Sequence, residues 1–226
     1  MPQISFHGHS VVQIRTDDHT IFIDPFITGN PLCDLKADDI KCDYIILTHA
    51  HGDHLGDTIE IAKRNDAEVI AMVELAHYCK DKGVKKVQTL NLGGSFKAPF
   101  GQVKLTLAHH SSITPDGKYA GPPAGVIIHL DDKTIYHAGD TALFYDMKLI
   151  GEMHKIDFAF MPAGDYFTMG PDDFVKAAEF VNAGVSVPIH YNTFPPIKID
   201  VHELCRKVEA VGKKCLIMEP GDTIDL

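Results

Sequence analysis

The 226-residue sequence predicts an α/β fold, and three patterns along the chain indicate it. Apolar strand-like runs alternate with helix-like segments between residues 44 and 90, which is typical of right-handed crossover units and a largely parallel sheet. From residue 94 to 137, short strands follow one another through tight turns, as in antiparallel sheets. Strand and helix alternate again over 156–218. The apolar fraction of 45% is sufficient for a substantial core.

The first elements expected are short strands followed by a loop. Ile4 and Phe6 mark one strand, and strands over 11–14 and 20–24 follow it. Residues 27–43 form a loop rich in Gly, Asn, Pro and Asp, and the apolar run 44–48 is a buried strand. The crossover segment then contains, in order, a helix over 58–64, a strand over 68–72, a helix over 73–82 and a strand over 87–90.

The second half begins with hairpins and ends with strand–helix units. The hairpin strands are expected over 95–97, 103–107, 126–130 and 134–137. The C-terminal part is expected to contain helices over 143–153, 171–181 and 201–211. The strands that alternate with these helices are expected over 156–161, 185–190 and 215–218. The long loop that ends at Pro123 follows a histidine pair, so it is a candidate substrate flap. Without repeats or linkers, residues 1–226 are predicted to form a single domain.

Charge and hydropathy argue against several classes of protein. The net charge of −10 argues against a general nucleic-acid binder, because such proteins need a basic surface. The sequence contains no run of about 18 apolar residues, so no membrane span is predicted. The N-terminus enters a strand without a basic region, so no secretory signal is visible and we expect a cytoplasmic protein.

The cysteine pattern favours thiols over disulfides. The number of cysteines is odd and no two of them form a CxxC pair, so we expect buried or free thiols in a reducing compartment. None lies beside the histidine clusters, which argues against thiolate as a metal ligand. The cysteines are Cys33, Cys42, Cys79, Cys205 and Cys215.

The segment His49–His54 carries the strongest chemical signal. It follows an apolar strand and contains three histidines and one aspartate, a set that suits divalent metals such as zinc. His49 and His51 are two residues apart, so they point to the same side of an extended strand end. Gly52 lets the chain turn and bring Asp53 and His54 towards that point. Four ligands are too many for one half-open ion, which indicates a pair of metals.

Strand ends elsewhere supply further candidates with competing interpretations. Adjacent residues in an extended chain face opposite ways, so His109 and His110 should not both bind one metal, and the spacing does not choose between them. Asp140 is suited to bridge two metals, although alone it would be interpreted as a helix N-cap. His190 ends a strand, where sites of open α/β sheets lie.

Three polar residues near the N-terminus also have two interpretations each. Asp24 is expected either to orient a metal-bound histidine or to close a turn. His7 and His9 flank a glycine at a strand break, so they either face a cleft or serve as hydrogen-bonded structural residues.

The motif His49-x-His51-x-Asp53-His54 resembles the signature of the metallo-β-lactamase superfamily. The whole chain is similar to one branch, the small metal-dependent hydrolases related to ascorbate-6-phosphate lactonase. The resemblance implies a four-layer αββα sandwich, with two mixed sheets flanked by helices. Further stretches that fit it are residues 6–10, 23–26, 137–141 and 188–192.

The resemblance also implies a ligand set. It places His49, His51 and His110 on a first metal and Asp53, His54 and His190 on a second, with Asp140 bridging. The ions are divalent, and Zn, Mn, Ni and Fe all fit histidine and carboxylate ligands.

The function expected is hydrolysis of a small ester, lactone or phosphodiester by a hydroxide that bridges the two metals. Asp53 would orient this nucleophile, and His9, or else His7, would donate a proton to the leaving group or hold a small, anionic substrate. No nucleic acid or membrane partner is expected, and homo-oligomer formation is left open. The alternatives are an iron-dependent oxidoreductase or dioxygenase on the same fold and a non-catalytic metal-binding protein.

Overall fold

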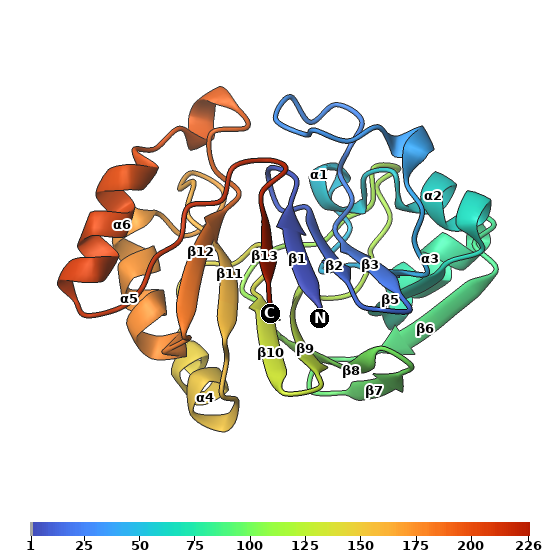
Figure 1. Cartoon of the computed structure of the whole chain (residues 1–226). Helices are drawn as coiled ribbons and strands as arrows, with labels where there is room; N and C mark the ends of the chain where they lie inside the picture. The colour runs from blue at the N-terminus through green and yellow to red at the C-terminus, as the bar shows by residue number, and fades with distance from the viewer. Residues whose placement is uncertain (1) are drawn as a thin grey trace.

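A computed structural model describes residues 2–226 and shows two β-sheets packed face to face between layers of helices (Figure 1). The predicted αββα arrangement of two mixed sheets is therefore confirmed. The first sheet has the order β13 (Thr223–Asp225), β1 (Gln3–Phe6), β2 (Val12–Arg15), β3 (Thr20–Ile23), β4 (Tyr44–Ile46), β5 (Glu68–Met72) and β6 (Lys86–Leu90). The second has the order β12 (Val185–Ile189), β11 (Phe158–Pro162), β10 (Lys133–His137), β9 (Ala124–Leu130), β8 (Gly101–Leu107) and β7 (Ser95–Ala98).

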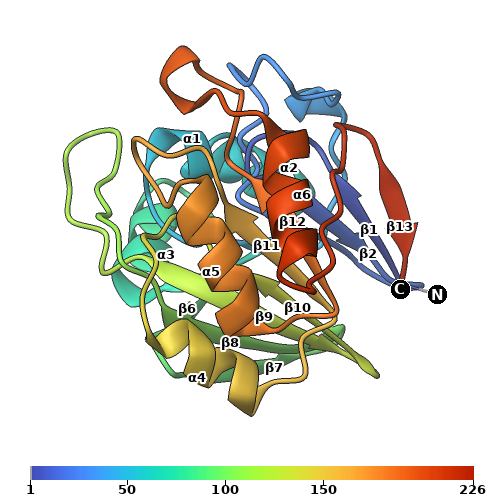
Figure 2. The same ribbon diagram turned by 90° about the vertical axis from the view of Figure 1, so that its left-hand side faces the viewer.

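The helices cover the outer faces of the two sheets, as Figures 1 and 2 show. Helices α2 and α3 pack on the first sheet, and α5 packs on the second with α4 and α6 beside it. The helices are α1 (Gly52–Leu55), α2 (Thr58–Asn65), α3 (Val73–Asp81), α4 (Asp146–Met153), α5 (Pro171–Val181) and α6 (Val201–Ala210), with 3₁₀ turns η1 (Ala37–Asp39) and η2 (Pro195–Ile197). The longest, α5, has 11 residues, and within residues 2–226 no helix is long and apolar enough to cross a membrane.

Strand direction follows the sequence patterns. The strands from β3 to β6 and from β10 to β12 are parallel, and α-helices join all of them except β3 and β4, which a loop with η1 connects. The hairpin strands β1 to β3 and β7 to β10 are antiparallel. The main core lies between the sheets, where Ile45 and Ile70 of the first sheet share one buried cluster with Val126 and Phe160 of the second. This core fixes how the strand ends of the two sheets meet.

The C-terminal strand prediction is wrong. Residues 215–218 make only one bridge, between Cys215 and Ser186, and their apolar side chains serve as packing. The missed strand is β13, in which Asp225 pairs with Gln3 at the edge of the first sheet. Its three residues are exposed or half-buried, so no alternation of apolar residues marks them.

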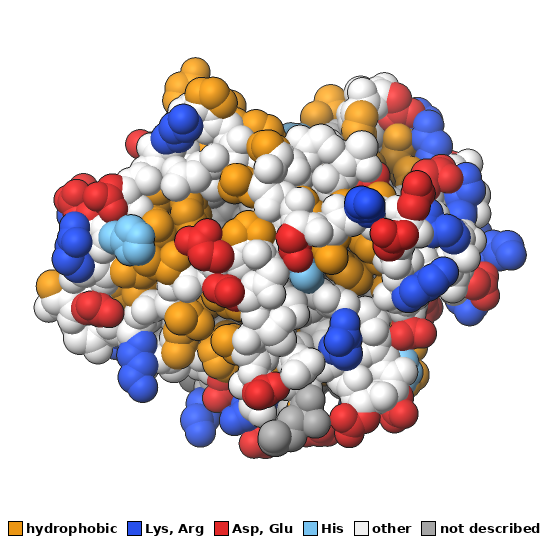
Figure 3. Space-filling view, turned by 45° about the horizontal axis from the view of Figure 1, so that its top comes forward, with side chains coloured by type: hydrophobic (Ala, Val, Ile, Leu, Met, Phe, Trp, Pro, Cys, Tyr) orange, Lys and Arg blue, Asp and Glu red, His pale blue; other side chains and the backbone are white. Residues whose placement is uncertain are grey.

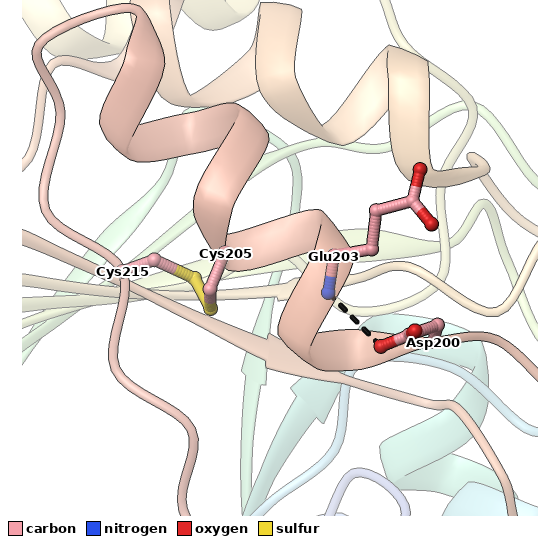
Figure 4. Close-up of a disulfide and its surroundings, with 4 residues drawn as sticks. All are labelled: Asp200, Glu203, Cys205 and Cys215. Carbon is pink, nitrogen blue, oxygen red and sulfur yellow. Dashed lines mark hydrogen bonds between the residues drawn. A yellow bond between two sulfur atoms is a disulfide. The ribbon is translucent and has the colours of Figure 1, made fainter.

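The prediction of free thiols is wrong for two of the five cysteines. Cys205 of α6 and Cys215 form a disulfide, with their Cα atoms 5.2 Å apart (Figure 4). The chain leaves α6 and turns back to pair with β12, which brings Cys215 against the helix. Their separation of ten residues carries no such signal in the sequence. The free cysteines are Cys33, Cys42 and Cys79.

Candidate metal centre

The candidate ligands come from four strand ends that meet at one edge of the sandwich. His49 and His51 follow β4, and Asp53 and His54 lie in α1 directly after them. His110, Asp140 and His190 come from the segments after β8, β10 and β12 of the other sheet. The edge is the one where α1 lies in Figures 1 and 2. Both sheets therefore contribute to a single site.

Three histidines form the first cluster. His49 Nε2 lies 2.9 Å from His51 Nδ1, and His110 Nε2 lies 3.3 Å from the same nitrogen. One nitrogen from each ring lies within 4.8 Å of the others, a spacing that could hold a metal ion. The structure thus brings together the three residues expected to share one metal.

The second cluster contains Asp53, His54 and His190, together with His9. Its ligand atoms also lie within 4.8 Å of one another. Asp53 Oδ2 is 3.2 Å from His9 Nε2 and 3.7 Å from His190 Nε2. Three histidines around one carboxylate match the nitrogen and oxygen donors that zinc, manganese or iron accept.

Asp140 lies between the two clusters and is buried. Its Oδ2 is 3.2 Å from His190 Nε2 and 3.5 Å from His110 Nε2, and its Oδ1 is 3.2 Å from His54 Nε2. The alternative of a helix cap is wrong, because α4 begins at Asp146 and its N-cap, Tyr145, makes no side-chain cap. One carboxylate thus reaches histidines of both clusters.

The polar atoms of the centre fit bound cations. Within the described residues, His54 Nε2, Asp140 Oδ1 and both ring nitrogens of His190 are buried without a hydrogen bond. Leaving such an atom unpaired costs about 1–3 kcal/mol, and coordination of a cation would remove that cost. The donor set, all imidazole and carboxylate, agrees with this fit.

The pKa values of the buried histidines reflect the negative charge of the carboxylates beside them. Burial disfavours charge on His190, but the Asp140 carboxylate outweighs burial and raises the pKa of His190 to about 9. In the same way Asp140 and Asp24 outweigh burial and hold the pKa of His54 well above its usual value. His49 differs, because burial and the neighbouring His54 lower its pKa well below the usual value. The carboxylates therefore favour positive charge between the rings.

Asp24 lies behind the second cluster. Its Oδ2 is 2.8 Å from His54 Nδ1 and also accepts a hydrogen bond of 2.5 Å from the Thr48 hydroxyl. Its Oδ1 accepts from the backbone N–H of Thr48 at 2.9 Å. The contact with His54 leaves Nε2 of that ring facing Asp140, which is how carboxylates orient metal-bound histidines. The side-chain contacts of Asp24 therefore support the first interpretation, in which it orients His54.

His9 and His7 have different surroundings. His9 Nδ1 is 2.9 Å from Thr193 Oγ1 while its Nε2 contacts Asp53, and the side chain is fully buried. His7 is not brought into the centre, because its ring nitrogens contact Asp34 at 2.8 Å and Gln13 at 3.1 Å. His7 therefore fits the second interpretation, that of a hydrogen-bonded structural residue.

The remaining histidines near the motifs point away. His109 is exposed and stacks on Phe144 with ring centroids 4.8 Å apart, which leaves His110 as the ring facing the centre. His137 Nε2 donates to the carbonyl of Ser10 at 3.0 Å. Thr193 was missed from the sequence, because nothing in the spacing links it to His9, 184 residues away.

The loop expected as a flap before Pro123 lies beside the segment that carries the first histidines. Its turn is closed by a bridge between Ile113 and Tyr119, and Pro115 lies about 4 Å from where a Cβ on Gly52 would be. At its start, Ser112 Oγ accepts a hydrogen bond from the N–H of Ala50, between the first two histidines of the motif. The loop thus contacts the segment that carries four candidate ligands.

The chain resembles known proteins over its whole length. Residues 19–191 match the family model of the β-lactamase superfamily domain. A UPF0173 metal-dependent hydrolase of Anoxybacillus flavithermus is 54% identical over 99% of this chain and 100% of its own, and one of Shouchella clausii is 53% identical with the same coverage. Among solved structures, Igni18, a metallo hydrolase of Ignicoccus hospitalis, superimposes with a TM-score of 0.90 at 39% identity, covering 99% of this chain and 97% of that one. The chain therefore belongs to the metallo-β-lactamase superfamily and, within it, to the UPF0173 metal-dependent hydrolase family.

Proposed function

We propose that this protein is a hydrolase whose dinuclear metal centre cleaves a small ester, lactone or phosphodiester. The observation that carries the proposal is Asp140, whose carboxylate contacts rings of both clusters. His49, His51 and His110 would hold one cation, and Asp53, His54 and His190 the other, with Asp140 between them. When bound, such a pair supplies a water molecule of lowered pKa and a Lewis acid for the carbonyl or phosphoryl oxygen.

Asp53 is the residue best placed to orient the attacking water. Its side chain is 30% exposed, so it faces both the centre and the solvent. Burial acts to raise its pKa, but the neighbouring His190 and the hydrogen bond with His9 outweigh burial and hold the pKa well below its usual range. Asp53 therefore stays ionised and acts as a hydrogen-bond acceptor, which fixes the direction of the nucleophile.

His9 is assigned a positioning role in place of proton donation. A side chain with no exposed surface and both ring nitrogens engaged does not reach a leaving group in this arrangement. Because Asp53 is ionised, Nε2 of a neutral His9 carries the proton and donates it, while Nδ1 accepts from the Thr193 hydroxyl. His9 thereby fixes the orientation of Asp53.

The test is Asp140→Ala in apoprotein reloaded with Zn, Mn, Ni or Fe, one metal at a time. We expect the wild type to bind two ions per chain and to hydrolyse 4-nitrophenyl acetate, a lactone or bis(4-nitrophenyl) phosphate. Because Asp140 contacts both clusters, the variant should lose metal and at least roughly 100-fold in kcat/KM. Metal analysis and rate measurement check this.

A matched control is Asp38→Asn, since the Asp38 side chain is 99% exposed and pairs only with Arg64 among the contacts described. This variant should keep both metal and activity. Full activity in Asp140→Ala would refute the dinuclear proposal. Oxygen consumption by the iron-loaded wild type, without hydrolysis, would favour the oxidoreductase alternative instead.

A further inference from the structure

The loop of residues 163–170 is built against the metal centre. A Cβ on Gly164 would lie 2.2 Å from the carbonyl oxygen of His190, so the loop leaves β11 in direct contact with that candidate ligand. At its other end the N–H of Met169 donates to the carbonyl of Thr141 at 2.9 Å, next to Asp140. In Figures 1 and 2 the loop rises beyond β11 on the same edge as α1. Both of its ends are thus fixed beside the centre.

The tip of this loop presents two aromatic rings to solvent. Tyr166 is 74% exposed and Phe167 is 53% exposed, and their ring centroids lie 4.7 Å apart at an interplanar angle of 80°. Asp165 and Tyr166 have φ values of +61° and +58°, a conformation that bulky residues rarely adopt. Asp165 Oδ1 stabilises it by accepting the N–H of Tyr166 at 2.8 Å.

This conformation is costly for the fold alone. The left-handed region is unfavourable for a bulky residue such as Tyr166, and the exposed rings gain little burial in return. Unfavourable backbone of this kind beside a candidate active centre indicates that the loop has a role in binding.

The tip of the loop carries no basic side chain. Residues 163–170 contain no lysine or arginine. Lys118 of the flap pairs with Asp116 at 3.8 Å and lies over the Tyr78 ring. Lys198 and Lys207 line, together with Gly164 and Asp165 of this loop, a recess of about 280 Å³ against α6, where Lys207 pairs with Asp172 at 2.8 Å. Phosphate and carboxylate groups are usually recognised by such cations, so the tip of the loop itself offers an anionic group no charged partner.

The surface near the centre is also partly apolar. In Figure 3 hydrophobic side chains gather on two raised rims, formed by the loop of η2 and the loop between β3 and β4, with a hollow between them. Leu32, on the second rim, is 37% exposed. Apolar surface thus borders the edge on more than one side.

We propose that Tyr166 and Phe167 determine specificity by binding the apolar, preferably aromatic, part of an uncharged ester or lactone. The inference rests on the proposed hydrolase function and replaces the expectation of an anionic metabolite. Stacking on exposed aromatic rings gives affinity without charge, and the metal centre beside the two ends of the loop would supply the reaction.

The test compares three ethyl esters with the same leaving group. The metal-loaded wild type should hydrolyse ethyl 3-phenylpropanoate with roughly tenfold higher kcat/KM than ethyl acetate, and should also prefer it to the anion monoethyl succinate. The double variant Tyr166→Ala/Phe167→Ala should lose this preference through KM, with ethyl acetate changed less than about twofold. Tyr145→Ala is the matched control, because Tyr145 is 69% exposed but lies before α4 against Phe180.

The outcomes separate the two proposals. Turnover of none of the esters, lactones or phosphodiesters by any metal form would refute the proposed function and the inference with it. Turnover without aryl preference, or a preference that the double variant keeps, would refute only the inference. A double variant that dissociates a wild-type dimer in light scattering while its kinetics stay unchanged would also refute it, because the rings would then bind a second copy of the chain.

Discussion

At the scale of single residues, neighbouring histidines of similar burial have different partners. His7 and His9 are 5% and 1% exposed and are separated only by Gly8. His9 has a φ of +58°, which turns its ring towards Asp53, whereas His7 pairs with Asp34. The sequence could not separate them, because the turn at Gly8 is fixed by tertiary contacts.

We predict that His9→Asn weakens binding of the second metal. Asparagine tolerates the left-handed backbone at this position but cannot reach both Thr193 and Asp53, so Asp53 loses its orientation. Removing such a supporting contact typically lowers metal affinity or activity roughly 10–100-fold. Metal titration and kcat measurements check this.

The control is His7→Asn, which removes contacts with Asp34, Gln13 and the Phe22 ring, all outside the metal centre. It should lower thermal stability while metal affinity stays within about twofold of the wild type. If the two variants lost metal equally, His9 would have no positioning role.

The candidate ligands were the most predictable residues of the chain. The dense cluster between His49 and His54 shows its chemistry in the spacing alone. For His110 and His190 the strand ends were visible, but the choice of His110 over His109 came from the family resemblance. Contacts made across the fold, such as Thr193 with His9, leave no local pattern and could not be predicted.

At the scale of elements, helices and central strands were predictable and the C-terminal edge was not. The crossover strands β4 and β5 are apolar apart from Glu68, and each is followed by a helix, so the sequence pattern identifies them. Strand β13 is short and half-exposed, and its pairing with β1 depends on the path of the whole chain. The same path joins Cys205 to Cys215, which cysteine counting did not indicate.

We predict that the disulfide stabilises the C-terminal region. It closes a segment with a sequence separation of ten between α6 and the residue that bridges to β12. Closing a loop of that length should stabilise the fold by about 2–3 kcal/mol, mainly through the entropy of the unfolded chain. Chemical denaturation with and without a reducing agent measures this difference.

The control for the reduction experiment is Cys205→Ser/Cys215→Ser. Its free energy of unfolding should match that of the reduced wild type and should not respond to the reducing agent. Equal stability of the oxidised and reduced wild type would contradict the prediction.

At the scale of the whole molecule, metal binding should depend on pH. The pKa of His190 is raised to about 9 in the metal-free protein, so below pH 9 this ring carries a proton that a cation must displace. Metal affinity should therefore fall as the pH falls, by about tenfold per pH unit for each proton displaced. Between pH 8 and 6 a loss of at least roughly 100-fold is expected.

Competition with a chromophoric chelator at several pH values, corrected for the chelator's own protonation, tests this. Because the pKa of His54 is also raised, replacing His190 by Gln should make the dependence shallower without abolishing it. An affinity that does not change with pH would contradict the prediction.

The candidate ligands are divided between the two sheets, with His49 to His54 on one and the last three on the other. Ion binding is thereby thermodynamically linked to how closely the two halves of the sandwich approach each other. A change of side-chain volume at Phe160, deep between the sheets, would alter the spacing of donor atoms that it never touches. A measured affinity for the ions would therefore report on how the side chains pack between the two sheets.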